Sequence, residues 1–168
     1  MHAAAYAFVC TAIADLQPRA VLEIGSLDVN STAQRMNVRT LVGDAAYTGI
    51  DTHPGLGVDI VASAADYDGD GAFDLVLSTE AMEHTPHPRD IVDCAWRALR
   101  PGGTFVLTAA GPERAPHGCD GGALPLHEHY ANIEPAQLRA LLADWRDVRV
   151  ARNPSAGDVY AVAIRPEA

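Results

Sequence analysis

Apolar residues recur along the chain at two spacings, one typical of helices and the other of buried strands. From Tyr6 to Leu16 they return at the i, i+3, i+4 spacing of an amphipathic helix, which we expect to end near Pro18. Short apolar runs bounded by Gly, Pro or Asp follow. They predict buried strands over residues 20–24, 47–51, 58–61, 72–77 and 104–108.

Helical patterns separate several of these strands. The oxygen-bearing side chains at 30–32 are suited to cap a helix that runs to about residue 39. Pro86 and Pro88 lead into a second helix, which the Pro-Gly-Gly sequence at 101–103 ends, and Pro135 opens a third. Strands alternating with helices are typical of a mostly parallel sheet.

The C-terminal part of the sequence has a different pattern. Residues 110–133 are rich in Gly, Pro and His and predict a long loop after the strand at 104–108. Two strands, 147–152 and 158–164, flank a turn at 153–157 and predict a hairpin. The fold class is therefore α/β, with a mostly parallel sheet and one antiparallel edge.

Composition narrows the possible chemistry. The chain has 168 residues, a length typical of one domain, and its formal net charge is −10. All 12 basic residues are Arg, so the sequence lacks both a Schiff-base lysine and the lysine of a phosphate-binding loop. The acidic excess argues against nucleic-acid and anionic-membrane partners. It lies almost wholly in residues 1–84, so an anionic partner would face the second half.

Three cysteines, Cys10, Cys94 and Cys119, form an odd number without close spacing, which favours a reducing compartment. A signal peptide has a basic stretch before its apolar region, and the apolar start of this chain has none. No apolar run reaches the ~18 residues of a membrane helix. We therefore expect a cytoplasmic protein.

Chemically informative residues follow three of the predicted strands. Gly25 comes directly after the first strand, Asp51 ends the second, and Glu80 follows the fourth. In open α/β sheets, ligands bind outside the carboxyl ends of the strands. A glycine there lets a ligand approach the backbone, and a carboxylate can accept two hydrogen bonds from a ribose.

Four sequence blocks, taken together, resemble the class I S-adenosylmethionine-dependent methyltransferases: VLEIGS at 21–26, YTGID at 47–51, FDLVLSTEAMEH at 73–84 and LRPGGTFVLT at 99–108. The resemblance covers about residues 3–165. It implies a single methyltransferase domain over 1–168 with a Rossmann-like, seven-stranded sheet, a C-terminal antiparallel hairpin and helices on both faces. The implied cofactor is S-adenosylmethionine, with S-adenosylhomocysteine as product.

The resemblance also implies a set of site residues. Glu23 and Gly25 would lie beside the methionine part of the cofactor, Asp51 would hold the ribose, and Ser63 would border the adenine. Glu80 would lie at the methyl side. The full expected cofactor-binding set is Glu23, Gly25, Ser26, Asp28, Asn30, Asp51, His53, Ser63, Ala64, Ser78 and Glu80.

The cofactor loop departs from the family pattern, because Leu27 and Val29 stand where further glycines are usual. Neither residue tolerates a positive φ, so we expect the loop to take another path. A nicotinamide-dinucleotide fingerprint needs glycine at the positions of Leu27 and Asn30, so the sequence argues against that class of protein. The missing glycines of the cofactor loop also leave open a protein that binds the cofactor without catalysing methyl transfer.

The sequence does not identify the methyl acceptor. The aromatic Asn-Pro-Pro type of motif found in adenine and glutamine methyltransferases is absent after the fourth strand, so an oxygen or simple amine nucleophile is favoured over DNA adenine. Histidine is the commonest general base near neutral pH. The candidates are His84, His117, His127 and His129.

We predict no metal site from the sequence. His117, Cys119, His127 and His129 carry suitable ligand atoms, but their spacing matches no known metal motif. Few residues separate Asp51 from the next strand, so the usual helix is reduced and the site is open. An open site favours a large acceptor or a homodimer that completes the pocket.

Overall fold

The computed structural model describes residues 1–29 and 38–167. Its helices are α1 (Ala3–Ile13), α2 (Val38–Leu41), the 3₁₀ helix η1 (Met82–His84), α3 (Pro88–Ala98) and α4 (Pro135–Leu141). Its strands are β1 (Ala20–Ile24), β2 (Ala46–Asp51), β3 (Ile60–Val61), β4 (Phe73–Thr79), β5 (Leu99–Ala110), β6 (Arg146–Asn153) and β7 (Asp158–Ile164). None of the helices in these ranges is long and apolar enough to span a membrane.

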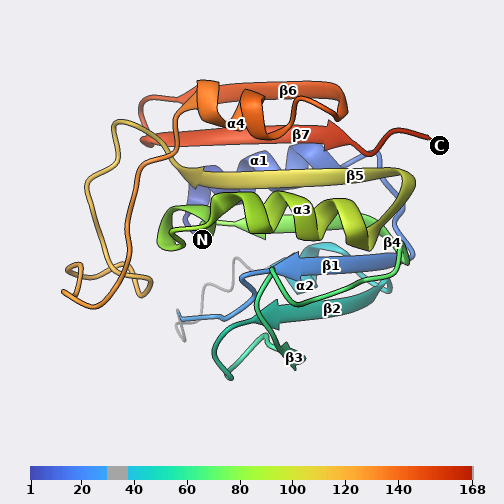
Figure 1. Cartoon of the computed structure of the whole chain (residues 1–168), viewed down its shortest axis with the longest axis horizontal. Helices are drawn as coiled ribbons and strands as arrows, with labels where there is room; N and C mark the ends of the chain where they lie inside the picture. Colours follow the sequence, from blue (N-terminus) through green and yellow to red (C-terminus); the bar gives the residue numbers. More distant parts are fainter. Residues whose placement is uncertain (30–37, 168) are drawn as a thin grey trace.

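The strands form one seven-stranded sheet in the order β3-β2-β1-β4-β5-β7-β6 (Figure 1). Every pairing from β3 to β5 is parallel, and β7 is antiparallel to both β5 and β6. The predicted α/β fold is confirmed with one refinement. The antiparallel strand is β7, which lies inside the sheet, whereas β6 forms the edge.

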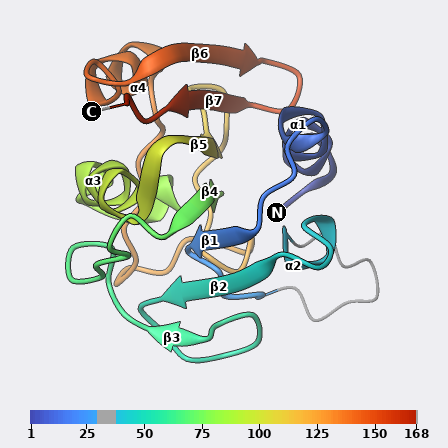
Figure 2. The same ribbon diagram turned by 90° about the vertical axis from the view of Figure 1, so that its right-hand side faces the viewer.

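Helices cover both faces of the sheet, as predicted. Figure 2 shows α3 and α4 on one side and α1 and α2 on the other. Each side has its own apolar cluster. Val9 of α1 and Val38 of α2 pack on Leu75 and Val106, whereas α3 and α4 pack on the opposite face. Burial on both faces explains why β1, β4 and β5 are nearly continuous apolar runs.

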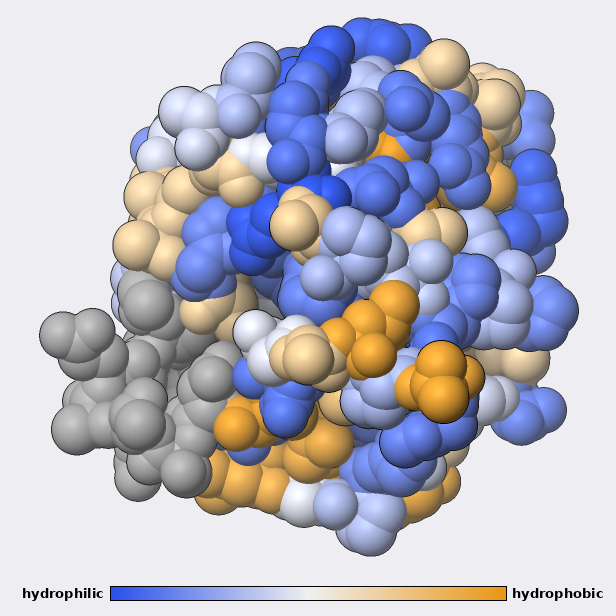
Figure 3. All heavy atoms as spheres, turned by 90° about the vertical axis from the view of Figure 1, so that its left-hand side faces the viewer, coloured by the Kyte–Doolittle hydropathy of each residue, from blue (hydrophilic) through white to orange (hydrophobic). Residues whose placement is uncertain are grey.

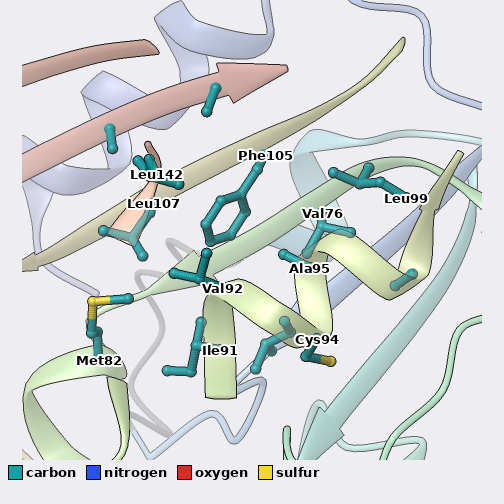
Figure 4. Packing of buried hydrophobic residues seen from close by; sticks show 14 of the residues in the cluster. Val76, Met82, Ile91, Val92, Cys94, Ala95, Leu99, Phe105, Leu107 and Leu142 are labelled. Carbon is teal, nitrogen blue, oxygen red and sulfur yellow. The ribbon is translucent and has the colours of Figure 1, made fainter. Parts of the chain in front are cut away.

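The larger cluster is built around α3. Figure 4 shows Val92 and Ala95 of this helix gathered with Val76 and Phe105 of the sheet. Phe105 is 1% exposed, and its ring also packs against Trp145, at a centroid distance of 5.5 Å. The apolar face of α3 is thus buried against the sheet.

Two elements differ from the bounds that the sequence predicts, and one lies partly outside the described residues. The strand expected over 58–61 is shortened to Ile60–Val61, since residues 52–59 form turns. The helix α3 ends at Ala98, before the Pro-Gly-Gly segment at 101–103 that was expected to end it, and this segment lies inside a longer β5. The helix expected from residues 30–32 begins outside the described residues.

We predict that Phe105→Ala lowers the free energy of unfolding by about 3–5 kcal/mol, because it leaves a cavity that the packed sheet and α3 cannot fill. Urea denaturation followed by circular dichroism measures this loss. Leu126→Ala is the matched control, since Leu126 is fully exposed and its loss should change stability by less than about 0.5 kcal/mol. Equal effects of the two substitutions would contradict the assigned core.

Candidate functional site

The carboxyl ends of the parallel strands meet at one end of the molecule, which Figure 3 views face on. A cavity of about 220 Å³ opens there beside β1. Its lining includes Glu23, Gly25, Ser26, Leu27, Asp28, Arg39, Tyr47, Leu56, Gly57 and Thr79. A larger cavity of about 560 Å³ lies at the amino ends of β1 and β2, between α1 and α2, away from the residues predicted to bind the cofactor.

Gly25 fixes the turn at the end of β1. Its φ is +80°, and a Cβ atom at this position would lie 2.5 Å from the Cβ atom of Ala81, just after β4. Its N–H donates to the carbonyl oxygen of Ile50 at 2.9 Å, and the N–H of Ser26 donates to the same oxygen at 3.0 Å. A side chain is therefore excluded on both conformational and steric grounds.

Neither Leu27 nor Val29 has a positive φ in the loop after Gly25. Among the described residues of this loop, only Gly25 has a positive φ. The loop lies against the turn that follows β2, where the Asp28 N–H donates to the Leu56 carbonyl oxygen at 2.8 Å. A Cβ atom on Gly57 would lie 2.4 Å from the carbonyl oxygen of Ser26. Glycine is thus required at position 57, opposite the loop, as well as at position 25, where the loop begins.

Asp51 ends β2 beside this loop, and its side chain is 15% exposed. One carboxylate oxygen accepts the N–H of Leu27 at 3.2 Å, and the other accepts the N–H of His53 at 3.0 Å. These two donors hold the carboxylate at the end of the strand. Since a carboxylate has about four lone-pair sites, it keeps acceptor capacity for a bound hydroxyl group.

Glu23 lies in β1 and is buried, with Thr79 donating to one oxygen at 3.2 Å and the hydroxyl of Tyr47 donating to the other. Burial raises the pKa of Glu23 to about 7, although both hydrogen bonds act in the opposite direction. The carboxyl group lines the cavity and changes charge near neutral pH.

The other predicted cofactor residues lie in varied surroundings. The Ser26 and Ser78 hydroxyls are buried and have no hydrogen-bond partner among the described residues. The Ser63 hydroxyl donates to Asp66 at 2.6 Å, at the start of the turn that contains Ala64. His53 is exposed and contacts Thr52. Asn30 lies outside the described residues.

Glu80 lies in a cluster of charged groups at the end of β4. Its carboxylate is 3.3 Å from the imidazole of His2 and 3.6 Å from the guanidinium of Arg114. Arg114 also pairs with the fully buried Asp158 of β7 at 2.8 Å. Burial alone would raise the pKa of Glu80, but the hydrogen bond and charge of His2 hold it below its usual range.

Two of the four predicted base candidates lie together on the acceptor side. The His84 and His117 ring centroids are 5.3 Å apart, and the Tyr130 ring packs edge-on against both. Burial, followed by the neighbouring His117, lowers the pKa of His84, which favours its neutral form at pH 7. The side chains of His127 and His129 are exposed, although the backbone of His129 contacts His84.

Several site residues escaped the sequence analysis. Glu83 is fully buried beside His84, and burial, followed by the charge of Glu80, raises its pKa to about 8. The sequence could have pointed to Glu83, because this residue belongs to the block quoted at 73–84. Tyr47 and Thr79 also belong to quoted blocks, but their contacts with Glu23, like those of Arg114 with Glu80, join segments far apart in the sequence.

We predict that Glu23→Gln becomes progressively more stable than the wild type as the pH rises from about 4.5 to 7. In that window the unfolded chain releases the Glu23 proton before the folded chain does, so rising pH favours unfolding of the wild type. At about 1.4 kcal/mol per pKa unit, the difference should approach about 3 kcal/mol above pH 7.

Urea denaturation at several pH values measures this difference, with the exposed Glu134→Gln as control. If the stability curves of Glu23→Gln and the wild type stay parallel across this pH range, Glu23 does not titrate as its burial implies.

Comparisons with known proteins agree with this geometry. The family model described as "Methyltransferase domain" matches residues 22–107, just over half of the chain. The chain is also 47% identical over 38 residues to the ubiquinone biosynthesis O-methyltransferases of Psychrobacter cryohalolentis and Psychrobacter arcticus. That stretch is 23% of this chain and spans 15% of the length of those relatives.

Solved structures share the whole architecture. The 1,6-didemethyltoxoflavin-N1-methyltransferase of Burkholderia thailandensis, solved with S-adenosylhomocysteine, aligns with a TM-score of 0.66 and 18% identity, over 98% of this chain and 77% of that one. The N-methyltransferase NodS of Bradyrhizobium japonicum, also solved with S-adenosylhomocysteine, aligns with a TM-score of 0.64 and 13% identity, over 98% and 86%. The chain thus belongs to the methyltransferase domain family and has the class I fold of S-adenosylmethionine-dependent methyltransferases.

Proposed function

We propose that this protein binds S-adenosylmethionine at the carboxyl ends of β1 and β2 and transfers its methyl group to an oxygen or simple amine nucleophile. One observation carries the proposal. Gly25, whose positive-φ turn lines the cavity, and the carboxylate of Asp51, which accepts the N–H of Leu27, lie at the ends of adjacent parallel strands. This is where open α/β sheets bind nucleoside-containing ligands.

The residues present fit the chemical groups of this cofactor. The spare lone pairs of Asp51 suit two ribose hydroxyls. In the cavity beside β1, Glu23 is an acceptor for an ammonium group and Arg39 provides a cation for a carboxylate. Ser26, whose buried hydroxyl lacks a partner, contributes a further polar group to this cavity. With about 220 Å³, the cavity suits the amino-acid end of the cofactor.

The bound cofactor supplies a methyl group already activated by its sulfonium charge. The protein must therefore mainly orient the nucleophile and accept its proton. His84 is placed for this, since it lies three residues beyond Ala81, which touches Gly25. Its neutral imidazole can take up a proton from a hydroxyl or amine. The O-methyltransferase relatives from Psychrobacter support an oxygen acceptor.

A second candidate function is cofactor binding without catalysis. It is favoured by the loop at 25–29, whose Leu27 N–H already donates to one Asp51 oxygen, while the N–H of His53 donates to the other. Calorimetry with S-adenosylhomocysteine and an assay of methyl transfer to alcohols, phenols, carboxylates and amines separate the two functions. Binding with turnover supports methyl transfer. Binding without turnover of any acceptor supports the second candidate, and no binding at millimolar ligand contradicts both.

We predict that Asp51→Ala weakens S-adenosylhomocysteine binding by about 1.5–3 kcal/mol, or roughly 10–150-fold. The reason is that the two hydrogen bonds from the ribose hydroxyls to the Asp51 carboxylate are lost. Calorimetry measures the change. Asp144→Ala, at an exposed position between α4 and β6, is the matched control and should bind like the wild type. An unchanged affinity of Asp51→Ala would show that the ribose lies elsewhere.

A further inference from the structure

Three side chains that carry metal-ligand atoms converge on the acceptor side of β4. Glu83 and His84 come from η1, and His117 comes from the long loop that follows β5. Each offers one ligand atom, and these three atoms all lie within 4.8 Å of one another. Ligands bound at about 2.1 Å from one ion are separated by up to about 4.2 Å, so only a small shift would bring them onto a common ion.

Two of these side chains carry buried atoms that nothing in the described structure satisfies. Glu83 is 0% exposed; its Oε1 accepts the N–H of Ala110 at 3.0 Å, but its Oε2 has no partner. Nδ1 of His84 is also buried and without a partner. A buried polar atom left unsatisfied costs about 1–3 kcal/mol, so each of these two atoms calls for a partner.

His117 is oriented as a metal-binding histidine would be. Its Nδ1 lies 3.0 Å from the carbonyl oxygen of Ala115 and donates to it, which leaves the lone pair on Nε2. Metal-bound histidines commonly donate their second ring N–H to a backbone carbonyl in this way. The rings of His84 and His117 are nearly perpendicular, at 83°, and Tyr130 packs against both of them.

We propose that Glu83, His84 and His117 form a binding site for one divalent transition-metal ion, such as Zn²⁺, Co²⁺ or Fe²⁺. Two imidazole nitrogens and one carboxylate oxygen are the ligand set these ions prefer, and three ligands leave coordination positions open. The proposal departs from our sequence-based expectation of no metal site. The histidines and cysteine considered there share only His117 with this cluster, because its other two ligands are Glu83 and His84.

The proposed function gives this site its significance, and the inference about acceptor activation rests on it. An ion held there would polarise a bound hydroxyl group by its charge, so that the hydroxyl proton is released to water rather than to an imidazole. Nδ1 of His84 cannot both bind the ion and accept a proton, so metal binding and proton uptake are competing roles for this atom.

The test is a titration of tag-free, chelator-treated protein with Co²⁺, followed by calorimetry and by the visible absorption of the bound ion. We expect one ion per chain, with the absorption of a nitrogen- and oxygen-coordinated site. Glu83→Gln and His117→Ala should each weaken Co²⁺ binding by more than about 100-fold, since even lost outer-shell partners typically cost 10–100-fold. His87→Ala, which removes an exposed histidine outside the cluster, should bind like the wild type.

The inference is overturned if the wild type binds no Co²⁺ stoichiometrically, or if both cluster variants bind it as well as His87→Ala does. Circular dichroism establishes whether each variant is folded. If Glu83→Gln does not fold, His117→Ala alone serves as the test, because His117 is half-buried and lies in a loop. S-adenosylhomocysteine binding is measured on the same samples. Cofactor binding without Co²⁺ binding rejects the metal site alone, and the reverse rejects the proposed function alone.

Discussion

The pairing of β1 with both β2 and β4 is the constraint on which the rest of the structure depends. From β1, the chain passes to β2 and β3 on one side of the sheet and then crosses to β4 and β5 on the other. The segments that follow β1 and β4 therefore separate at their carboxyl ends, which opens a crevice there. The crevice can close no further than the contact between Gly25 and Ala81, where there is no space for a Cβ atom.

Around the end of β4, a cluster of charged groups holds the neighbouring segments together. His2, Glu80, Arg114 and Asp158 come from four separate segments and contact one another around the end of β4. Buried ion pairs contribute little net stability, because desolvation offsets their attraction. Their directional hydrogen bonds instead hold the start of the loop after β5 against β7, and this loop supplies His117 and Tyr130. The arrangement of His117 and Tyr130 beside His84 thus depends on segments that no single motif contains.

The sequence was a reliable guide wherever one local pattern decided the outcome. The runs at 20–24 and 47–51 predicted β1 and β2 almost to the residue, and Gly25 and Asp51 lie at the strand ends as expected. Ser63 shows the limit of this reasoning, because its hydroxyl bonds to Asp66, a contact within a turn that sequence alone did not reveal. Glu83 shows a second limit, since an unsatisfied buried oxygen becomes visible only when its whole surroundings are known.

Binding of the cofactor at the ends of β1 and β2 is the central claim, and titration of ¹⁵N-labelled protein with S-adenosylhomocysteine, followed by amide chemical shifts, tests it most directly. The account predicts the largest shifts at Gly25, Ser26, Leu27 and His53, around the loop and the Asp51 carboxylate. The opposite result is binding in the larger cavity between α1 and α2. Shifts confined to its lining, at Cys10, Ala14, Leu41 and Ala45, would contradict the account.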